Sequence, residues 1–421
     1  MSSLISRDTI KSVIYDQQSF YLKDKSVVRD GDLDLGKDNE IVILSGIRRC
    51  GKSTLLQQIM HNNKEKDYFL NFDDDRLVKF SVDDFQQLLE VFIEIYGVQH
   101  TFYFDEIQNI PDWERFVRRL HDQGNKIYIT GSNATMLSKE LGTRLTGRHY
   151  RYELFPFSFK EFLRLNKVAY SIEDQYNTQG RAILKSNFNT YFLNGGFPAY
   201  LRYGNREYLK SLYESILYRD VMVRNKISNE KEILELVMYL ASNTSRLVTY
   251  NSLKNVIGIQ NATTIKNYLE YVQNTYLLFL VNKYDASIKK QTRNPRKTYF
   301  IDLALVRMVG FHNSEDNGRL LENLVFLELK RRSKEIYYHK NKKECDFVLK
   351  TKTKITEAIQ VSWSIVDPNT RKREIDGLLE AMDEHKLKFG LILTDSEEEE
   401  IKVDKKNIKI MPVWKWMLQD K

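Results

Sequence analysis

The stretch Gly46-Ile47-Arg48-Arg49-Cys50-Gly51-Lys52-Ser53 decides the fold class of the first part of this chain. It matches the pattern G-x-x-x-x-G-K-[ST], and it lies between an apolar run typical of a buried strand, Ile41–Ser45, and a helical pattern over residues 54–60. The two glycines let the backbone curl so that successive N–H groups point at a phosphate, and the following helix adds the positive end of its dipole. We therefore predict a phosphate-binding loop at residues 46–54, in which Lys52 contacts the terminal phosphates and Ser53 ligates Mg²⁺.

Arg48, Arg49 and Cys50 fill variable positions of this loop, and Thr54 is its last residue. Either arginine contacts a phosphate or a neighbouring acid, and the pattern does not choose between these roles. Oxidation of Cys50 would block a nucleotide, but a small apolar filler is the simpler interpretation.

Two adjacent acids follow an apolar strand in Phe102-Tyr103-Phe104-Asp105-Glu106. A carboxylate at such a strand end holds Mg²⁺ directly or through water, which is the role we predict for Asp105. A carboxylate within one water of the γ-phosphate polarises the attacking water, which is the role we predict for Glu106. A solvated acidic pair is the alternative, but together with the loop the two acids predict ATP hydrolysis with Mg²⁺.

A polar turn, Gly131-Ser132-Asn133, follows the apolar run at residues 126–130. A side chain at the tip of the adjacent strand can sense the γ-phosphate and orient water, and Asn133 is the first candidate and Ser132 the second. A turn or a helix cap is the alternative, since Ser and Asn favour both places.

Two arginines further along, Arg144 and Arg148, are candidates to neutralise transition-state charge. They would act within the same chain or across a subunit interface. The alternative is that both are ordinary surface arginines.

Short apolar runs alternate with helical patterns from about residue 40 to 155. Alternation of this kind predicts an α/β fold with a parallel sheet covered by helices on both faces. The predicted strands are residues 41–45, 68–71, 101–104, 126–130 and 150–154.

The composition is that of a globular protein. Apolar residues make up 42 % of the 421 residues, and there are only 6 Pro and 18 Gly, which excludes collagen-like and wholly disordered chains. The 2 cysteines cannot form a disulfide framework, and the 7 histidines show no ligand spacing, so no zinc site is predicted.

No apolar run approaches the ~20 residues that span a bilayer, and the start of the chain lacks the pattern of a secretory signal. We therefore expect a cytoplasmic protein with no membrane partner.

Several different short motifs lie between residues 46 and 221. They are residues 46–54, Asp105-Glu106-Ile107-Gln108, Gly131-Ser132-Asn133, Thr146-Gly147-Arg148, Leu154-Phe155-Pro156-Phe157-Ser158, Asn194-Gly195-Gly196-Phe197-Pro198 and Tyr218-Arg219-Asp220-Val221. Together they resemble a prokaryotic AAA-type ATPase family whose C-terminal region has no assigned function. The resemblance implies a P-loop NTPase fold with an AAA/STAND-like parallel sheet, and ATP and Mg²⁺ as cofactors.

The middle of the chain is mostly helical, and its order resembles a winged helix, as the family implies. A helix (Glu230–Ser242), a short helix and a recognition helix that carries Lys266 precede a strand at residues 277–281, a loop and a strand at residues 298–301. The loop would be the wing.

Basic residues concentrate in this wing. Against one acid, Asp285, stand six bases that give the segment a net charge of +5, out of +8 for the whole chain. Such a patch can neutralise the phosphates of duplex DNA, which is the predicted partner, and a protein-binding wing is the alternative. The six bases are Lys283, Lys289, Lys290, Arg293, Arg296 and Lys297.

The last part of the chain resembles the restriction-endonuclease-like fold. In that superfamily an acid on the first helix, an aspartate on one strand and a Glu/Gln-x-Lys on the next hold a divalent metal. Glu322, Asp346 and Gln360 match the first three of these positions and form a candidate remnant of a nuclease site.

The fourth position of that pattern is different, because Ser362 stands where the lysine belongs. A neutral hydroxyl cannot supply the cation, although Lys372 or Arg373 on the next helix could reach back. We therefore predict an inactive nuclease-like domain kept for binding or assembly.

These patterns predict three domains: a P-loop ATPase domain (1–160), a helical and winged-helix region (161–310) and a small restriction-endonuclease-like α/β domain (311–421). The predicted function is a nucleotide-driven switch that hydrolyses ATP and acts on DNA, on a protein partner or on further copies of the chain. The alternatives are a DNA-binding module that uses ATP as a structural ligand and an ATP-dependent nuclease.

Overall fold

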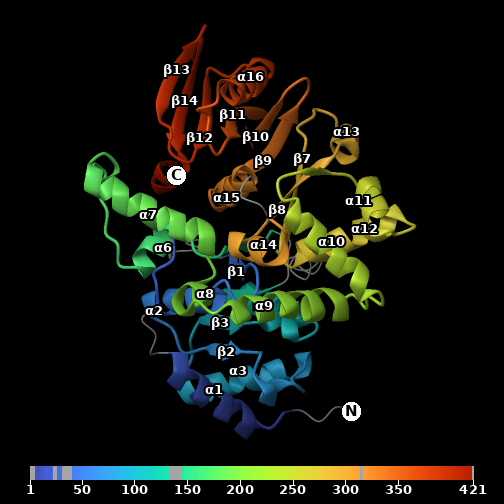
Figure 1. The fold of residues 1–421 in the computed structure, drawn as a ribbon. Coiled ribbons are helices and arrows are strands. Elements are labelled where there is room, and N and C mark those ends of the chain that lie inside the picture. The colour runs from blue at the N-terminus through green and yellow to red at the C-terminus, as the bar shows by residue number, and fades with distance from the viewer. Residues whose placement is uncertain are drawn as a thin grey trace. The chain divides into compact units, whose positions relative to one another are not determined.

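The computed structural model describes residues 5–21, 26–30, 40–132, 145, 147–312 and 316–419. The chain forms two compact units, Met1–Phe155 and Pro156–Lys421 (Figure 1). Residues 161–310 and 311–421, predicted as separate domains, thus belong to one compact unit, and the three-domain division stays a prediction.

A five-stranded parallel sheet forms the centre of the N-terminal unit, in the order β2-β3-β4-β1-β5. The predicted α/β fold is confirmed, and each predicted strand end lies within one residue of an observed one. The strands are β1 (Ile41–Ser45), β2 (Phe69–Asn71), β3 (Thr101–Asp105), β4 (Lys126–Gly131) and β5 (His149–Glu153).

Helices cover both faces of this sheet. Successive strand residues point to opposite faces, so Ile41 and Ile43 join the cluster formed with α1 (Arg7–Tyr21), α3 (Phe85–Tyr96) and α4 (Trp113–Asp122). The other face is covered by α2 (Lys52–Asn62), which packs against β1, β3 and β4.

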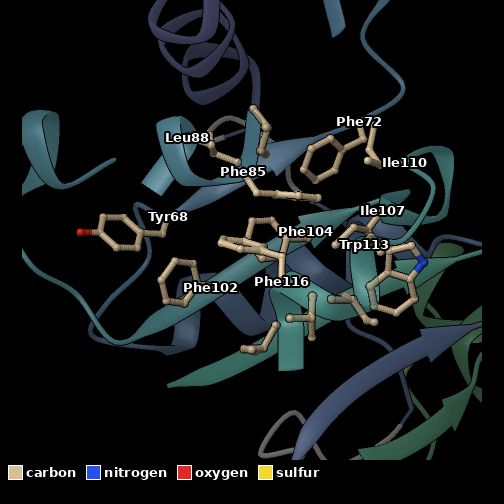
Figure 2. Packing of buried hydrophobic residues seen from close by; sticks show 14 of the residues in the cluster. Tyr68, Phe72, Phe85, Leu88, Phe102, Phe104, Ile107, Ile110, Trp113 and Phe116 are labelled. Atoms are coloured by element: carbon tan, nitrogen blue, oxygen red, sulfur yellow. The ribbon is translucent and has the colours of Figure 1, made fainter. Parts of the chain in front are cut away.

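The core of the first face is unusually aromatic, as Figure 2 shows. Phe85 of α3 stacks on Phe116 of α4 with ring centroids 4.4 Å apart, and Tyr68 stacks on Phe92 at 4.8 Å. Each such ring contributes about 1.5–3 kcal/mol by leaving water. This packing fixes the sheet whose strand ends carry the candidate site.

The first half of the C-terminal unit is mainly helical. A π-helical segment, Ile216–Val223, continues α9, and a short helix lies in the connection predicted as the wing loop. The helices up to that point are α6 (Phe159–Leu165), α7 (Thr178–Asn194), α8 (Pro198–Tyr203), α9 (Arg206–Ser215), α10 (Glu230–Ser242), α11 (Tyr250–Ile257), α12 (Ala262–Asn274) and α13 (Ile288–Arg293).

Two sheets complete the C-terminal unit. A three-stranded antiparallel sheet has the order β6-β8-β7, with β6 (Leu247–Val248), β7 (Leu278–Asn282) and β8 (Arg296–Phe300). A six-stranded mixed sheet has the order β13-β14-β12-β11-β10-β9. Its strands are β9 (Glu335–Lys340), β10 (Glu344–Thr351), β11 (Lys354–Val361), β12 (Phe389–Thr394), β13 (Glu399–Val403) and β14 (Lys406–Pro412).

Four helices belong with these sheets: α14 (Leu303–Val309), α15 (Asn317–Arg331), α16 (Pro368–Glu384) and α17 (Val413–Leu418). α16 packs against β10, β11 and β12, while α15 contacts β8, β9 and β11 and so joins the smaller sheet to the larger one. Among the helices described, none has both the length and the apolar character needed to cross a bilayer.

Candidate nucleotide site

The loop between β1 and α2 curls around the side chain of Lys52. Gly46 and Gly51 have φ of +152° and +103°, values that favour glycine, and a Cβ on Gly46 would lie 2.2 Å from the Leu154 carbonyl oxygen. Lys52 is the first residue of α2 and is only 4 % exposed. Its ammonium donates to the carbonyl oxygens of Gly46 and Ile47, both at 3.2 Å. The loop thus holds a buried cation on its own backbone.

Arg29 anchors this loop to the end of β5, a contact that no sequence motif signals. Its guanidinium donates to the carbonyl oxygens of Cys50 and Phe155, both at 2.6 Å. Cys50 is buried, and its thiol donates to the Leu154 carbonyl at 3.4 Å. Burial raises the pKa of the Cys50 thiol, so this cysteine is a poor nucleophile and has the surroundings of a small filler.

The remaining loop residues lie at its rim. Arg48, Ser53 and Thr54 are partly buried, and Arg49 is exposed. Arg49 has a φ of +65°, the left-handed conformation that turns the chain toward Gly51. Ser53 and Thr54 lie in the first turn of α2, where the backbone N–H groups of a helix have no partner within the helix.

Asp105 ends β3 in a fully buried position. Its Oδ1 accepts a hydrogen bond from the Thr130 hydroxyl at 2.5 Å, whereas its Oδ2 is buried and has no hydrogen-bond partner among the residues that the structure describes. Burial, and then the charge of Glu106, raise the pKa of Asp105 to about 6, although the hydroxyls of Thr130 and Ser53 act in the opposite direction. One oxygen of this carboxylate is therefore available to a ligand. Its buried surroundings disfavour a negative charge that has no positive partner.

Glu106 follows in a strained conformation, with φ of +51°. Its backbone N–H donates to the Thr130 hydroxyl at 2.9 Å, and its carboxylate accepts a hydrogen bond from the side-chain amide of Gln108. The Thr130 hydroxyl thus links both acids to the end of β4. Its signal in the sequence is a single polar residue at the tip of an apolar strand.

The parallel sheet brings these groups to one edge. Ser45 at the end of β1 pairs with Gly131 at the end of β4, and β3 lies on the other side of β4. Ser132 directly follows β4 at this edge. The other predicted sensor, Asn133, and Arg144 lie outside the described residues.

The structure does not bring Arg148 to the phosphate-binding loop of its own chain. Its carbonyl accepts the N–H of Ile41 at 2.8 Å, at the start of β1, and its guanidinium lies 3.4 Å from Asp122. Since β1 and β5 are parallel, Arg148 lies at the edge opposite the loop, on the order of 15 Å away for a strand of this length. Only the role across a subunit interface remains as a prediction.

The predicted basic wing divides into buried and exposed parts. Lys297 is 1 % exposed, so the prediction that it contacts DNA is wrong. Arg296 lies over the ring of Tyr250, 5.2 Å from its centroid, and donates to its hydroxyl at 2.5 Å. The exposed basic residues are Lys289, Lys290 and Arg293 on α13 and Lys266 on α12.

Lys297 instead lies inside an acidic cluster of the C-terminal unit. Its ammonium is 2.7 Å from Asp346, 2.9 Å from Glu322 and 2.9 Å from Glu344. The Tyr299 hydroxyl donates to Glu322 at 2.6 Å. Burial acts to lower the pKa of Lys297, but the Asp346 and Glu322 carboxylates outweigh it and hold that pKa well above its usual range.

The structure does bring together the predicted remnant of a nuclease site. Gln360 accepts the backbone N–H of Asp346 at 3.1 Å and donates to Glu374, and Asp346 accepts the N–H of Val361 at 2.9 Å. Burial, and then the charge of Asp346, raise the pKa of Glu322. Three carboxylates therefore surround a cation that the chain itself supplies, and Gln360 hydrogen-bonds to the backbone of Asp346 beside it.

The source of that cation differs from the predicted one. Lys372 is exposed, and Arg373 pairs with the neighbouring Glu374 at 2.6 Å while 68 % of its side chain is exposed. Ser362 donates to the Ser364 carbonyl at 3.0 Å. The cation comes from Lys297 on β8, a strand of the other sheet, so the spacing of the C-terminal motif could not reveal it.

Comparison with known proteins divides the chain into three matched segments. A model described as an AAA domain matches residues 38–163, and models of two domains of unknown function, DUF8612 and DUF4143, match residues 185–315 and 317–416.

Relatives match along nearly the whole chain. The uncharacterized protein MJ1544 of Methanocaldococcus jannaschii is 36 % identical, with 99 % of this chain and 97 % of that protein covered. An uncharacterized protein of Haemophilus influenzae is 30 % identical over 91 % of this chain and 96 % of its own length.

Solved structures match more weakly. The Aeropyrum pernix Orc1 protein in complex with DNA is 9 % identical with a TM-score of 0.27, covering 73 % of this chain and 93 % of its own. The Thermotoga maritima RuvB Holliday junction branch migration motor is 15 % identical with a TM-score of 0.29, covering 66 % and 92 %.

Proposed function

The chain belongs to the prokaryotic AAA-type ATPase family, and from that premise we propose that it binds ATP with Mg²⁺ and hydrolyses the γ-phosphate. One observation carries the proposal. Asp105 is fully buried, and its Oδ2 has no hydrogen-bond partner in the described part of the chain, beside a loop that holds the buried cation of Lys52. An orphaned buried carboxylate oxygen costs about 1–3 kcal/mol or more, and a ligand that occupies it recovers this cost.

The residues present fit Mg²⁺. This ion takes oxygen ligands and is held by few protein groups together with phosphate oxygens. The Ser53 hydroxyl and the free oxygen of Asp105 supply one neutral and one anionic oxygen. When bound, Mg²⁺ neutralises charge on the phosphates during transfer.

Lys52 and Glu106 have separate roles in this proposal. The Lys52 ammonium exchanges two loop carbonyls, each at 3.2 Å, for oxygens of the terminal phosphates, which leaves its charge paired. Glu106 polarises the attacking water. Two hydrogen bonds hold Glu106 in position, one from its backbone N–H to the Thr130 hydroxyl and one from the Gln108 amide to its carboxylate.

Turnover of ATP by single variants tests these roles. Lys52→Ala should lose both ATP binding and phosphate release, whereas Glu106→Gln should still bind ATP but release phosphate about 10²–10⁴-fold more slowly. Lys405→Ala, which removes an exposed lysine of the other unit, is the matched control and should behave as the parent. Unchanged turnover in both Lys52→Ala and Glu106→Gln would end the proposal.

A duplex-DNA partner is the second part of the proposal, and its support is the exposed basic face of α13. Lys289, Lys290 and Arg293 are exposed on this short helix, and Lys266 is exposed on α12. Binding that depends on phosphate contacts weakens steeply as salt is raised, because counterions are released on binding.

Charge reversal of Lys289, Lys290 and Arg293 together should remove most of this DNA affinity and flatten its salt dependence. Reversal of Lys402, Lys405 and Lys409, exposed around the β13–β14 hairpin, makes the same change of charge elsewhere and is the control. Equal losses in the two triple variants would reject α13 as the contact. DNA-stimulated phosphate release would favour a switch, and tight ATP binding without release would favour ATP as a structural ligand.

The exposed basic face also suits an acidic protein partner or a further copy of the chain. The same triple variant at α13 should then lose binding to that partner. An ATP-dependent nuclease has less support, since the ammonium of Lys297 already pairs with Glu322, Glu344 and Asp346. Nicking of DNA that requires Mn²⁺ and disappears in Asp346→Ala would reverse this preference.

A further inference from the structure

A second group of metal-ligating side chains lies in the C-terminal unit, at the junction of β9 and the end of α16. His339 is on β9 and is 2 % exposed, Glu384 is the last residue of α16, and His385 follows it. One ligand atom from each of the three residues lies within 4.8 Å of the others. Tetrahedral ligands at 2.0–2.2 Å from Zn²⁺ lie roughly 3.3–3.5 Å apart, so only a small contraction separates this arrangement from a metal site.

The surroundings of His339 are those of a ligand whose ring is held in place. Its Nε2 is 3.2 Å from a carboxylate oxygen of Glu380, while its Nδ1 faces Glu384 at 4.0 Å. A carboxylate on one ring nitrogen leaves the other nitrogen unprotonated and directed at a metal, as is usual for metal-binding histidines. Glu380 is fixed in turn, because it accepts the backbone N–H of Lys343.

His385 supplies an independent observation. Its Nε2 is buried and has no hydrogen-bond partner among the described residues, and its ring stands edge-on to that of His339 with centroids 5.5 Å apart. An imidazole nitrogen that is buried and has no hydrogen-bond partner is available to a transition metal.

We propose that His339, Glu384 and His385 bind a divalent transition metal ion of the Zn²⁺ type, with Glu380 orienting His339. Two nitrogens and one carboxylate oxygen favour Zn²⁺ over Mg²⁺ or Ca²⁺, which prefer oxygen ligands. Glu384 is 47 % exposed and accepts a hydrogen bond from the side-chain amide of Asn341. Because its side chain is at the surface, it is the ligand that moves to close the site. A water takes the fourth position. The ion joins the end of α16 to the β9–β10 hairpin. Since the two histidines lie far apart in the sequence, no motif of ligand spacing predicts this site.

Metal binding by the full chain tests the proposal directly. The protein is freed of metal with EDTA, kept free of nucleotide, and titrated with Co²⁺, whose visible absorption reports a low-symmetry nitrogen and oxygen site, and with Zn²⁺ against a chromophoric chelator. One ion per chain is expected. Glu384→Gln and His385→Ala should each weaken binding about 100-fold or more, and Glu380→Gln about tenfold, as for an orienting partner.

Two controls separate this site from other acidic or histidine-bearing places. His61→Ala removes an exposed histidine of α2, and Asp346→Asn removes a carboxylate of the Lys297 cluster. Both should bind Zn²⁺ as the parent does, and Zn²⁺ should raise the melting temperature of the parent but not that of His385→Ala.

Glu384 lies at the surface, so Glu384→Gln should fold. It therefore tests the site even if His385→Ala does not fold. The proposal is overturned if the parent binds no Zn²⁺ at concentrations up to about 100 μM, if Glu384→Gln and His385→Ala bind as tightly as the parent, or if Asp346→Asn loses binding instead. In those cases the two histidines serve as packing groups beside Tyr284, whose ring already meets His385 edge-on.

Discussion

Lys52 and Lys297 are both buried beside carboxylates, and they are used in opposite ways. Lys52 in the N-terminal unit is 4 % exposed and donates to two backbone carbonyls of its loop, while the neighbouring Asp105 keeps an oxygen that no described residue hydrogen-bonds. Lys297 in the C-terminal unit is 1 % exposed and pairs with three carboxylates at 2.7–2.9 Å. The first lysine and its acid are each left able to bind something else, whereas the second lysine and its acids satisfy one another.

The difference shows why matching residue types alone do not identify a working site. Natural proteins break local rules of polar satisfaction mainly at functional sites, and Asp105 breaks such a rule. The Lys297 cluster follows the rule, because a buried charge is accompanied by opposite charges and hydrogen bonds. We therefore expect Lys297 to matter most for stability and Asp105 to matter for ligand binding at a cost in stability.

The largest expected effect is that of Lys297→Met. The substitution leaves Glu322, Glu344 and Asp346 close together without a cation, and breaking a buried ion pair by removing one partner costs about 3–5 kcal/mol. The free energy of unfolding of the C-terminal unit, from urea denaturation at pH 7, should fall by about this amount. Lys289→Met, at an exposed site, should change it by less than about 0.5 kcal/mol. A loss below about 1 kcal/mol for Lys297→Met would contradict a structural role.

The second expected effect has the opposite sign. Asp105→Asn removes a carboxyl whose pKa in the folded protein is about 6, above its ordinary value of 3.8. The folded protein therefore binds more protons than the unfolded chain between about pH 4 and 6, and its stability falls as the pH rises through this range. The variant should be more stable than the parent by up to about 3 kcal/mol at pH 8 and by little at pH 4.

This measurement uses urea denaturation of the nucleotide-free protein in EDTA, so that no metal shields Asp105. Glu106→Gln provides a comparison at the adjacent carboxylate, which is partly exposed. A variant that is less stable than the parent at pH 8, or a gain that does not shrink toward pH 4, would show that Asp105 is not strained by its surroundings.

Thr130→Val tests the link between the two acids of the first site. Valine has nearly the same shape, but it removes the donor to Asp105 and the acceptor of the Glu106 N–H. Loss of partners for buried groups costs about 1–3 kcal/mol, so we expect a loss of about 2 kcal/mol together with slower ATP turnover. Thr130→Ser keeps the hydroxyl and should restore both. Parent-like turnover in Thr130→Val would mean that Glu106 does not need this support.

The same two sites show how far the sequence could predict this protein. The phosphate-binding loop and the acids after β3 are local patterns, and the alternation of strands and helices predicts the parallel sheet that brings them to one edge. The contacts of Arg29 and Thr130 depend on the fold, and only the polar residue at the end of an apolar strand hints at Thr130.

Lys297 shows the opposite limit. It belongs to a run of bases that, read along the chain, predicts an exposed wing, yet its place on β8 directs it into the Glu322 and Asp346 cluster. Charge counting along a segment cannot tell which side of a strand faces a neighbouring sheet. The sequence does not reveal the residues of the candidate metal site for a related reason, because β9 and α16 meet only in the folded unit.

The smallest expected effect belongs to Arg373→Ala. The sequence offers Arg373 as a candidate for the missing cation, but among the described residues its ion-pair partner is Glu374 at 2.6 Å, and 68 % of its side chain is exposed. Water solvates the Arg373 guanidinium, and the buried Glu374 carboxylate keeps the hydrogen bond from Gln360 when Arg373 is removed, so we expect the pair to contribute about 1 kcal/mol or less. Urea denaturation should therefore show a loss of less than about 1 kcal/mol, alongside the much larger loss for Lys297→Met. A loss above about 1.5 kcal/mol would mean that Arg373 helps to balance the charge of Asp346, and the C-terminal cluster would then hold two cations instead of one.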